Sequence, residues 1–116
     1  MNPVNEQSQR PWGNYYKFHQ EPGVWVKRVE VNPNSRLSLQ KHQHRSEKWI
    51  VVAGKGLAIV DHNEIVVEPG VVVDIPLGAI HRISNTGTQQ LVFIEVACGA
   101  ELTEEDIIRL QDDYSR

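Results

Sequence analysis

Residues 37–49 have the sequence LSLQKHQHRSEKW and carry several side chains that can bind metal ions. Gln40, His42 and His44 alternate along this segment, and Glu47 follows a short distance later. Side chains two residues apart on a strand point to the same face, so an amide and two imidazoles would meet on one side. Imidazole together with carboxylate suits zinc, manganese, iron or nickel. The segment therefore predicts half of a metal site, against the simpler alternative of an ordinary strand that happens to carry histidines.

A second half of such a site is offered by His81, which directly follows the segment PLGAI. Thiolate ligands are scarce, because Cys98 is the single cysteine of the chain. It lies in the apolar run VFIEVAC, which predicts a buried thiol, and it cannot form an internal disulfide. The sequence thus favours an imidazole and carboxylate site over a cysteine-rich structural zinc site.

Short runs of β-branched residues make up most of the chain and would have to position these ligands. Turn-forming sequences such as NPNS, DHN, EPG and NTGT separate the runs, and this spacing is typical of an all-β sandwich or barrel. Valines run without alternation in two of them, which favours strands covered on both faces and hence a homodimer. The predicted strands span residues 24–31, 37–42, 49–54, 56–61, 64–68, 71–76, 81–84 and 90–97.

The two ends of the chain differ from this strand pattern. Residues 1–9 are polar and show no periodicity, which predicts a flexible N-terminal tail. Residues 10–100 would form the barrel. In residues 101–116, Thr103 is a candidate N-cap and acidic residues follow it in the first turn. We therefore expect a short C-terminal helix packed on the barrel.

The composition argues against several classes of function. The chain has 116 residues, the size of one domain. A net charge of −3 and a pI near 5.9 give no basic footprint for nucleic acid. No apolar run approaches the length of a membrane span, and the N-terminus lacks the apolar region of a secretory signal. With its single cysteine, the chain is predicted to be cytoplasmic, with neither nucleic acid nor membrane as a partner.

Two spaced motifs resemble those of the cupin superfamily. The first is Gln40-x-His42-x4-Glu47-x6-Gly54, with glutamine where the first histidine usually stands. The second is Gly70-x5-Pro76-x-Gly78-x2-His81-x3-Asn85, which matches at every named position. The resemblance implies a small jelly-roll β-barrel with a metal ion in its mouth.

A more specific resemblance covers residues 10–116. The segments RPWG, LSLQKHQHRSEKW, IPLGAIHRISN and LTEEDIIRLQDDYSR are similar to the type II mannose-6-phosphate isomerase domain. In many proteins that domain is fused behind a mannose-1-phosphate guanylyltransferase, so this chain resembles a free-standing version. The resemblance implies a sugar phosphate as substrate and one divalent ion, zinc first, with manganese, nickel, cobalt or iron as alternatives. The implied ligands are Gln40, His42, Glu47 and His81.

Interconversion of mannose 6-phosphate and fructose 6-phosphate requires a polarised substrate oxygen, a base that moves a proton between neighbouring carbons, and a cationic site for the phosphate. For catalysis, the candidates are His44, Arg45 and Lys48. For substrate binding, they are Arg36, Ser38, Trp49 and Arg82. Arg36 is in phase with Gln40, and Arg45 lies in the bend beside the site. Lys48 and Arg82 are out of phase with the neighbouring ligands.

Two other functions remain open at this point. One is a metal-dependent cupin enzyme with another small-molecule substrate, including oxygen chemistry on iron. Gln40 argues modestly against that chemistry, because the usual ligand set of such enzymes is rich in histidine. The other is a non-catalytic module that binds a sugar or a nucleotide sugar beside a separate transferase. Turnover distinguishes the isomerase from a binding module, whereas retention of metal does not.

Overall fold

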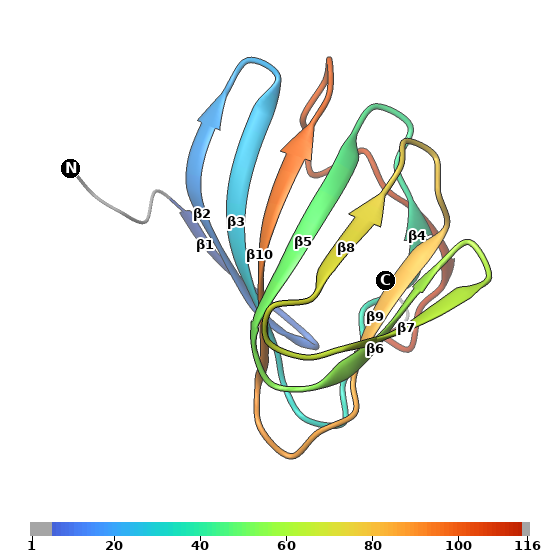
Figure 1. The fold of residues 1–116 in the computed structure, drawn as a ribbon. Helices are drawn as coiled ribbons and strands as arrows, with labels where there is room; N and C mark the ends of the chain where they lie inside the picture. The colour runs from blue at the N-terminus through green and yellow to red at the C-terminus, as the bar shows by residue number, and fades with distance from the viewer. Residues whose placement is uncertain (1–5, 115–116) are drawn as a thin grey trace.

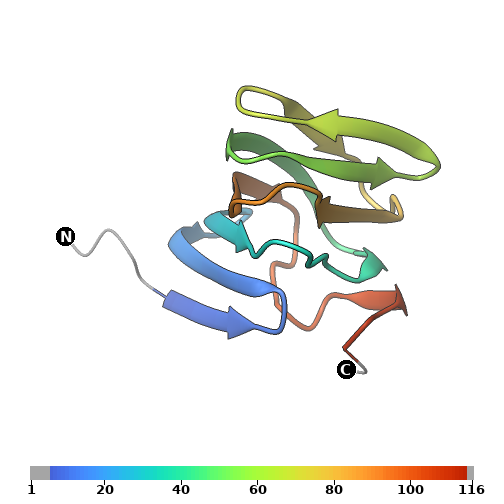
Figure 2. The same cartoon turned by 90° about the horizontal axis from the view of Figure 1, so that it is seen from below.

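The computed structural model describes residues 6–114 and contains eleven strands in two sheets, with no helix in that part of the chain. Figures 1 and 2 show the sheets facing each other across a shared interior, as in a jelly-roll barrel. The larger sheet has the order β1-β2-β3-β10-β5-β8 and the smaller one β11-β4-β9-β6-β7. The strands are β1 (Glu6–Arg10), β2 (Gly13–Glu21), β3 (Val24–Val31), β4 (Leu39–Lys41), β5 (Ser46–Ala53), β6 (Gly56–Val60), β7 (Asn63–Val67), β8 (Val72–Ile75), β9 (His81–Asn85), β10 (Leu91–Cys98) and β11 (Ile108–Gln111).

The core fills the space between the two sheets with large apolar side chains. Along β3, every second residue is buried, as expected for a strand that faces the core on one side. Trp49 and Phe93 pack in the centre with their ring centroids 4.7 Å apart, and Ile83 from the smaller sheet is fully buried. Full burial of such a side chain stabilises the fold by roughly 1.5–3 kcal/mol. This apolar packing closes one end of the barrel and leaves the other end to polar groups.

The all-β class and the jelly-roll barrel are confirmed, and most strands lie where the sequence predicts them. The predicted strand at residues 24–31 coincides with β3. Residues 6–9, expected in the flexible tail, instead form β1 together with Arg10 and pair with β2. An edge strand needs only backbone hydrogen bonds to one neighbour, so its polar sequence carried no periodic signal. Residues 1–5 of the expected tail lie outside the described residues.

The prediction of a C-terminal helix is wrong. Residues 101–114, here called the C-terminal strap, contain a turn at residues 104–105 and then β11, which pairs with β4. The acidic residues that suggested a helix start are used for contacts with the barrel. Asp106, for example, accepts hydrogen bonds from the backbone N–H groups of Gln43 and His44. These tertiary contacts outweigh a helix propensity worth only fractions of a kcal/mol per residue.

Cys98 is exposed, which corrects the prediction of a buried thiol. It is the last residue of β10, and the burial pattern of that strand places its side chain on the outer face. Within residues 6–114, the structure has no helix that is both long enough and apolar enough to cross a membrane.

Candidate metal centre

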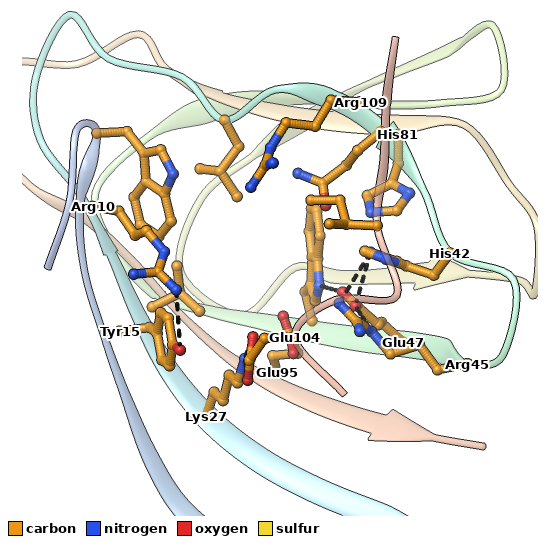
Figure 3. Close-up of a pocket in the computed structure, with 16 residues that line it drawn as sticks. Arg10, Tyr15, Lys27, His42, Arg45, Glu47, His81, Glu95, Glu104 and Arg109 are labelled. Atoms are coloured by element: carbon orange, nitrogen blue, oxygen red, sulfur yellow. Dashed lines mark hydrogen bonds and ion pairs between the residues drawn. The ribbon is translucent and has the colours of Figure 1, made fainter. Parts of the chain in front are cut away.

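A cavity opens at the polar end of the barrel, between the two sheets and beneath the C-terminal strap. Its volume is about 90 Å³, room for an ion with a few water molecules. Figure 3 shows charged side chains pointing into it from both sheets and from the strap. The smaller sheet and the start of β5 supply the side chains at one side, and β2, β3 and β10 supply those at the other.

His42, Glu47 and His81 meet at one side of this cavity. Their ligand atoms all lie within 4.8 Å of one another, and the three residues are only 3%, 3% and 2% exposed. His42 follows the end of β4, Glu47 stands near the start of β5, and His81 opens β9. His42 Nε2 lies 3.3 Å from Glu47 Oε2. The structure thus brings together three of the four ligands implied by the sequence, from segments far apart in the chain.

The two imidazoles are held so that the same ring nitrogen of each points to the site. His42 Nδ1 donates to the backbone oxygen of Asp106 at 2.6 Å, and His81 Nδ1 donates to that of Ala79 at 2.9 Å. These hydrogen bonds select the tautomer in which each Nε2 carries a lone pair. In His42 this lone pair faces Arg45 Nη2 at 3.3 Å, a contact that a bound ion would replace. Burial lowers the pKa of His42 to about 4 and lowers the pKa of His81 as well. Both rings are therefore neutral near pH 7, the form that binds metals.

Gln40 is the fourth expected ligand and stands directly opposite His81 in the pairing of β4 with β9. Its side chain is buried and lines the cavity. The amide nitrogen donates to Ser38 Oγ at 3.0 Å. The amide oxygen is then the atom that can accept a cation, because the nitrogen end is occupied. Ser38 does not line the cavity, and its contact with substrate stays a prediction without support from the geometry.

Glu47 is the anion of the site. Arg45 Nε donates to one of its oxygens and Trp49 Nε1 to the other, each at 2.8 Å. Burial is the largest single influence and would raise the pKa of Glu47, but the Arg45 guanidinium and the two neighbouring histidines together outweigh it, and the pKa falls to about 2. Arg45 also donates to the Thr103 backbone oxygen. Arg45 therefore orients the Glu47 carboxylate and keeps it ionised. A bound metal ion would share this carboxylate with Arg45.

These four side chains fit a first-row divalent ion. Two neutral imidazoles, one carboxylate and one amide oxygen are the donor types that zinc, manganese, nickel and iron accept. With Glu47 as the single anion of the set, a bound divalent ion would keep a net positive charge. Such an ion can act as a Lewis acid on a carbonyl or hydroxyl oxygen.

Several residues predicted for catalysis or substrate binding do not line the cavity. Arg36 pairs with Asp113, and Lys48 is exposed and pairs with Asp74. Arg82 donates to the backbone oxygen of Leu37 and to the side-chain oxygen of Gln111. His44 is exposed and faces Glu101 at 3.7 Å. None of these four predicted residues lines the cavity. The phase argument failed for Arg36 because residues 36–38 do not continue β4, and Leu37 turns into the cavity instead.

Two tryptophans do line the cavity. Trp49 was predicted to contact substrate and is buried beside His81, with ring centroids 5.7 Å apart. Trp12 is 6% exposed and belongs to both the lining and the core.

The opposite side of the cavity is charged, and the sequence analysis missed it. Lys27 Nζ contacts both oxygens of Glu104 at 2.9 and 2.8 Å. Glu95 is buried and accepts a hydrogen bond from Trp25 Nε1 at 2.8 Å. A usable signal existed for two of the missed residues: Lys27 and Glu95 are charged residues inside apolar strands, in phase with buried neighbours. The full set of missed charged or polar lining residues is Arg10, Tyr15, Lys27, Glu95, Glu104 and Arg109.

The fold and the candidate site together define the class of protein. An antiparallel jelly roll with two histidines, a carboxylate and an amide at its mouth is a cupin barrel with a candidate metal site. The family model described as "Mannose-6-phosphate isomerase C-terminal" matches residues 2–112, and this chain belongs to that family.

Among curated relatives, the chain is 41% identical over 107 residues to the alginate biosynthesis protein AlgA of Pseudomonas aeruginosa, covering 92% of this chain and 22% of AlgA. It is 39% identical over 113 residues to a mannose-1-phosphate guanylyltransferase of Escherichia coli K12, covering 97% of this chain and 24% of the relative. The chain therefore spans less than a quarter of the length of either protein.

Two solved structures have the same fold. The capsular polysaccharide assembling protein CapF of Staphylococcus aureus superposes with a TM-score of 0.83 at 25% identity, covering 96% of this chain and 32% of CapF. The Cnp3 cupin domain of Schizosaccharomyces pombe gives a TM-score of 0.71 at 17% identity, covering 84% of this chain and 70% of that domain. The second likeness concerns the fold alone.

Proposed function

We propose that this chain is a metal-dependent aldose–ketose isomerase that interconverts mannose 6-phosphate and fructose 6-phosphate. The observation that carries the proposal is the convergence of His42, Glu47 and His81 in a buried site, in a chain of the mannose-6-phosphate isomerase C-terminal family. We propose zinc as the ion. The sugar phosphate is the expected partner, and a cytoplasmic location remains a prediction from the sequence.

Different side chains of the cavity would bind the metal ion and the phosphate group of the substrate. His42, Glu47, His81 and Gln40 would hold the ion, which supplies Lewis-acid polarisation of the sugar oxygens when bound. The phosphate needs cations. Arg10 and Arg109 line the cavity and replace Arg36, Lys48 and Arg82 as our candidates for this role. In Figure 3, Arg10 lies across the opening from His42, whereas Arg109 reaches toward the opening from the side of His81. A phosphate bound by Arg10 would leave the reactive carbons of the sugar toward the metal ligands.

A coupled assay for fructose 6-phosphate tests this proposal. The protein is stripped of metal, reloaded with zinc, cobalt, manganese or nickel, and supplied with mannose 6-phosphate. We expect turnover that requires metal and is lost in His42→Ala, while His62→Ala, an exposed histidine outside the cavity, keeps it. Tight metal binding without turnover under any of these conditions would reject the isomerase.

A non-catalytic sugar-binding module is the second candidate. It is favoured by the Escherichia coli relative, whose name states a guanylyltransferase activity alone although 97% of this chain aligns with it. Such a module would bind mannose 6-phosphate or a nucleotide sugar in a titration calorimeter with no product formed. His81→Ala would then leave sugar affinity intact, whereas in the isomerase it abolishes turnover.

A further inference from the structure

Glu95 is a buried carboxyl group at the centre of the larger sheet that the metal site does not use. It lies on the inner face of β10, where Lys27 of β3 and Trp49 of β5 are its neighbours in the strand pairing. It is 8% exposed, and its side chain lines the cavity (Figure 3). Carboxyl groups are seldom buried in a core unless they are paired or have a function.

The strand register places Glu95 diagonally from Glu47. Glu47 is opposite Ala97, and Glu95 is opposite Trp49, so the two acids lie on adjacent strands and on the same face. Diagonal neighbours of this kind are about 7–8 Å apart. This separation allows a small molecule bound beside Glu47 to reach Glu95 as well.

Glu95 is also less restrained than the other acids of the cavity. Both oxygens of Glu47 accept side-chain hydrogen bonds, and both oxygens of Glu104 are bound by Lys27. Glu95 Oε2 accepts from Trp25 Nε1, and within residues 6–114 no hydrogen bond is formed to Oε1. Because no fully buried side-chain oxygen in that range lacks a partner, Oε1 must have access to the cavity. It is therefore available to a ligand.

The protonation of Glu95 suits proton transfer. Burial raises its pKa to about 8, and the charge of Glu47 contributes further. A carboxyl group that titrates near neutral pH can take up a proton and give it back. A divalent ion at Glu47 would offset part of this effect, which shifts Glu95 toward the carboxylate. His44, the base considered from the sequence, is exposed and lies outside the cavity lining.

We propose that Glu95 is the catalytic acid–base that carries a proton between C2 and C1 of the open-chain sugar phosphate, an assignment that rests on the proposed function. The Glu95 carboxylate takes the proton from C2 of the aldose. The C2–H electron pair forms the C1–C2 double bond, and the carbonyl π pair moves to O1, giving an enediolate. The O2 proton passes to O1. The O2 electron pair then forms the C2 carbonyl, and the double-bond pair takes the proton from Glu95 at C1, which yields the ketose.

Three variants test this assignment: Glu95→Gln, which keeps the shape, Glu95→Asp, which keeps the acid, and Glu68→Gln as a control on the exposed surface. Each is loaded with the metal that supports wild-type turnover, and metal content and thermal stability are checked. Two readouts follow: turnover of mannose 6-phosphate, and deuterium incorporation from D2O into C1 of fructose 6-phosphate by NMR.

We expect Glu95→Gln to lower kcat by about 10²–10⁴-fold, with metal content and KM within a few-fold of wild type, and to lose exchange in parallel. Glu95→Asp should recover part of both, and Glu68→Gln should match the wild type. Loss of folding or of metal in both Glu95 variants would mean a structural role and overturn the assignment. An active wild type beside an equally active Glu95→Gln overturns this assignment alone, whereas an inactive wild type overturns the proposed function together with it.

Discussion

At the scale of single residues, the cationic side chains of the cavity differ in whether they are already paired with a carboxylate. Arg45 is only 7% exposed and is committed to Glu47 at 2.8 Å, so it is not available as a phosphate ligand. Arg10 lines the cavity, contacts Tyr15 and Ser8, and has no carboxylate partner among the described residues. Arg109 lines the cavity from β11.

Replacement of the lining arginines should therefore weaken substrate binding. Arg10→Ala and Arg109→Ala are each expected to raise KM for mannose 6-phosphate about 10- to 100-fold, since each removes a hydrogen bond to a charged group. Arg36→Ala and Lys48→Ala are the matched controls, because both residues lie outside the cavity. Steady-state kinetics would contradict this account if the controls raised KM as much as the lining residues.

The buried histidines predict how the stability of the metal-free protein depends on pH. His42 has a pKa of about 4 in the folded chain against 6.5 as the ordinary value. The unfolded chain therefore takes up this proton first as the pH falls. The contribution of His42 to the free energy of unfolding is therefore fully present above pH 6.5 and is lost between pH 6.5 and about 4, a loss of about 3 kcal/mol.

His81 acts in the same direction as His42, because burial lowers its pKa too. Urea unfolding of metal-free protein across this pH range measures the effect. Because the raised pKa of Glu95 acts in the opposite direction over part of this range, the His42 contribution is measured as the difference between wild type and His42→Gln, with the surface change His62→Gln as control. A pH dependence that is the same in His42→Gln and in wild type would contradict the neutral buried imidazole.

At the scale of elements, the C-terminal strap is part of the candidate metal site. Its backbone accepts the Nδ1 proton of His42 at Asp106 and a hydrogen bond from Arg45 at Thr103. The Asp106 carboxylate binds the N–H groups of Gln43 and His44, each at 2.9 Å. The segment that carries His42 is thereby tied to the strap.

We expect Asp106→Ala to weaken metal binding about 10- to 100-fold, the usual cost of losing a group that orients a metal ligand. The barrel should remain folded, because Asp106 lies outside the apolar core. Asp113→Ala is the control, since Asp113 belongs to the same strap but pairs with Arg36 away from the cavity. Competition with a coloured chelator measures both affinities, and equal affinities would show that the strap does not orient His42.

The C-terminal strap also shows which features could not be predicted from the sequence. The convergence of His42, Glu47 and His81 was predictable because the spacing within each motif is local, and β3 was predictable because its burial alternates with the strand period. β11 was not, because its partner β4 lies far back in the chain and the acidic residues near Thr103 imitate a helix start. Lys27 and Glu95 required the register of β3 and β10, which places distant residues side by side.

At the scale of the whole molecule, the outer face of the larger sheet carries a group of exposed apolar side chains on β5 and β8. Ile50, Val52 and Val72 are 43%, 44% and 56% exposed, and Ile50 is paired with Val72 across β5 and β8. The unbroken valine runs in the sequence thus reflect strands with apolar residues on both faces, one of which the single chain leaves uncovered. The homodimer predicted from the sequence stays a prediction, and this face is our candidate for its contact.

Sedimentation velocity of the purified chain tests the dimer. We expect a dimer for the wild type and a monomer for Val72→Lys, because a charge placed in an apolar contact is costly to bury. Glu64→Lys, at an exposed position of β7 in the smaller sheet, serves as the control for a change of surface charge. A monomeric wild type at micromolar concentration would refute the homodimer.

The central claim is that one ion, held by His42, Glu47, His81 and Gln40, makes this chain an isomerase. The most direct measurement is the rate of fructose 6-phosphate formation as stripped protein is titrated with zinc. The account predicts a rate that rises in proportion to added zinc and stops rising at one ion per chain. A rate that is independent of zinc, or absent at every loading although zinc is bound, would contradict it.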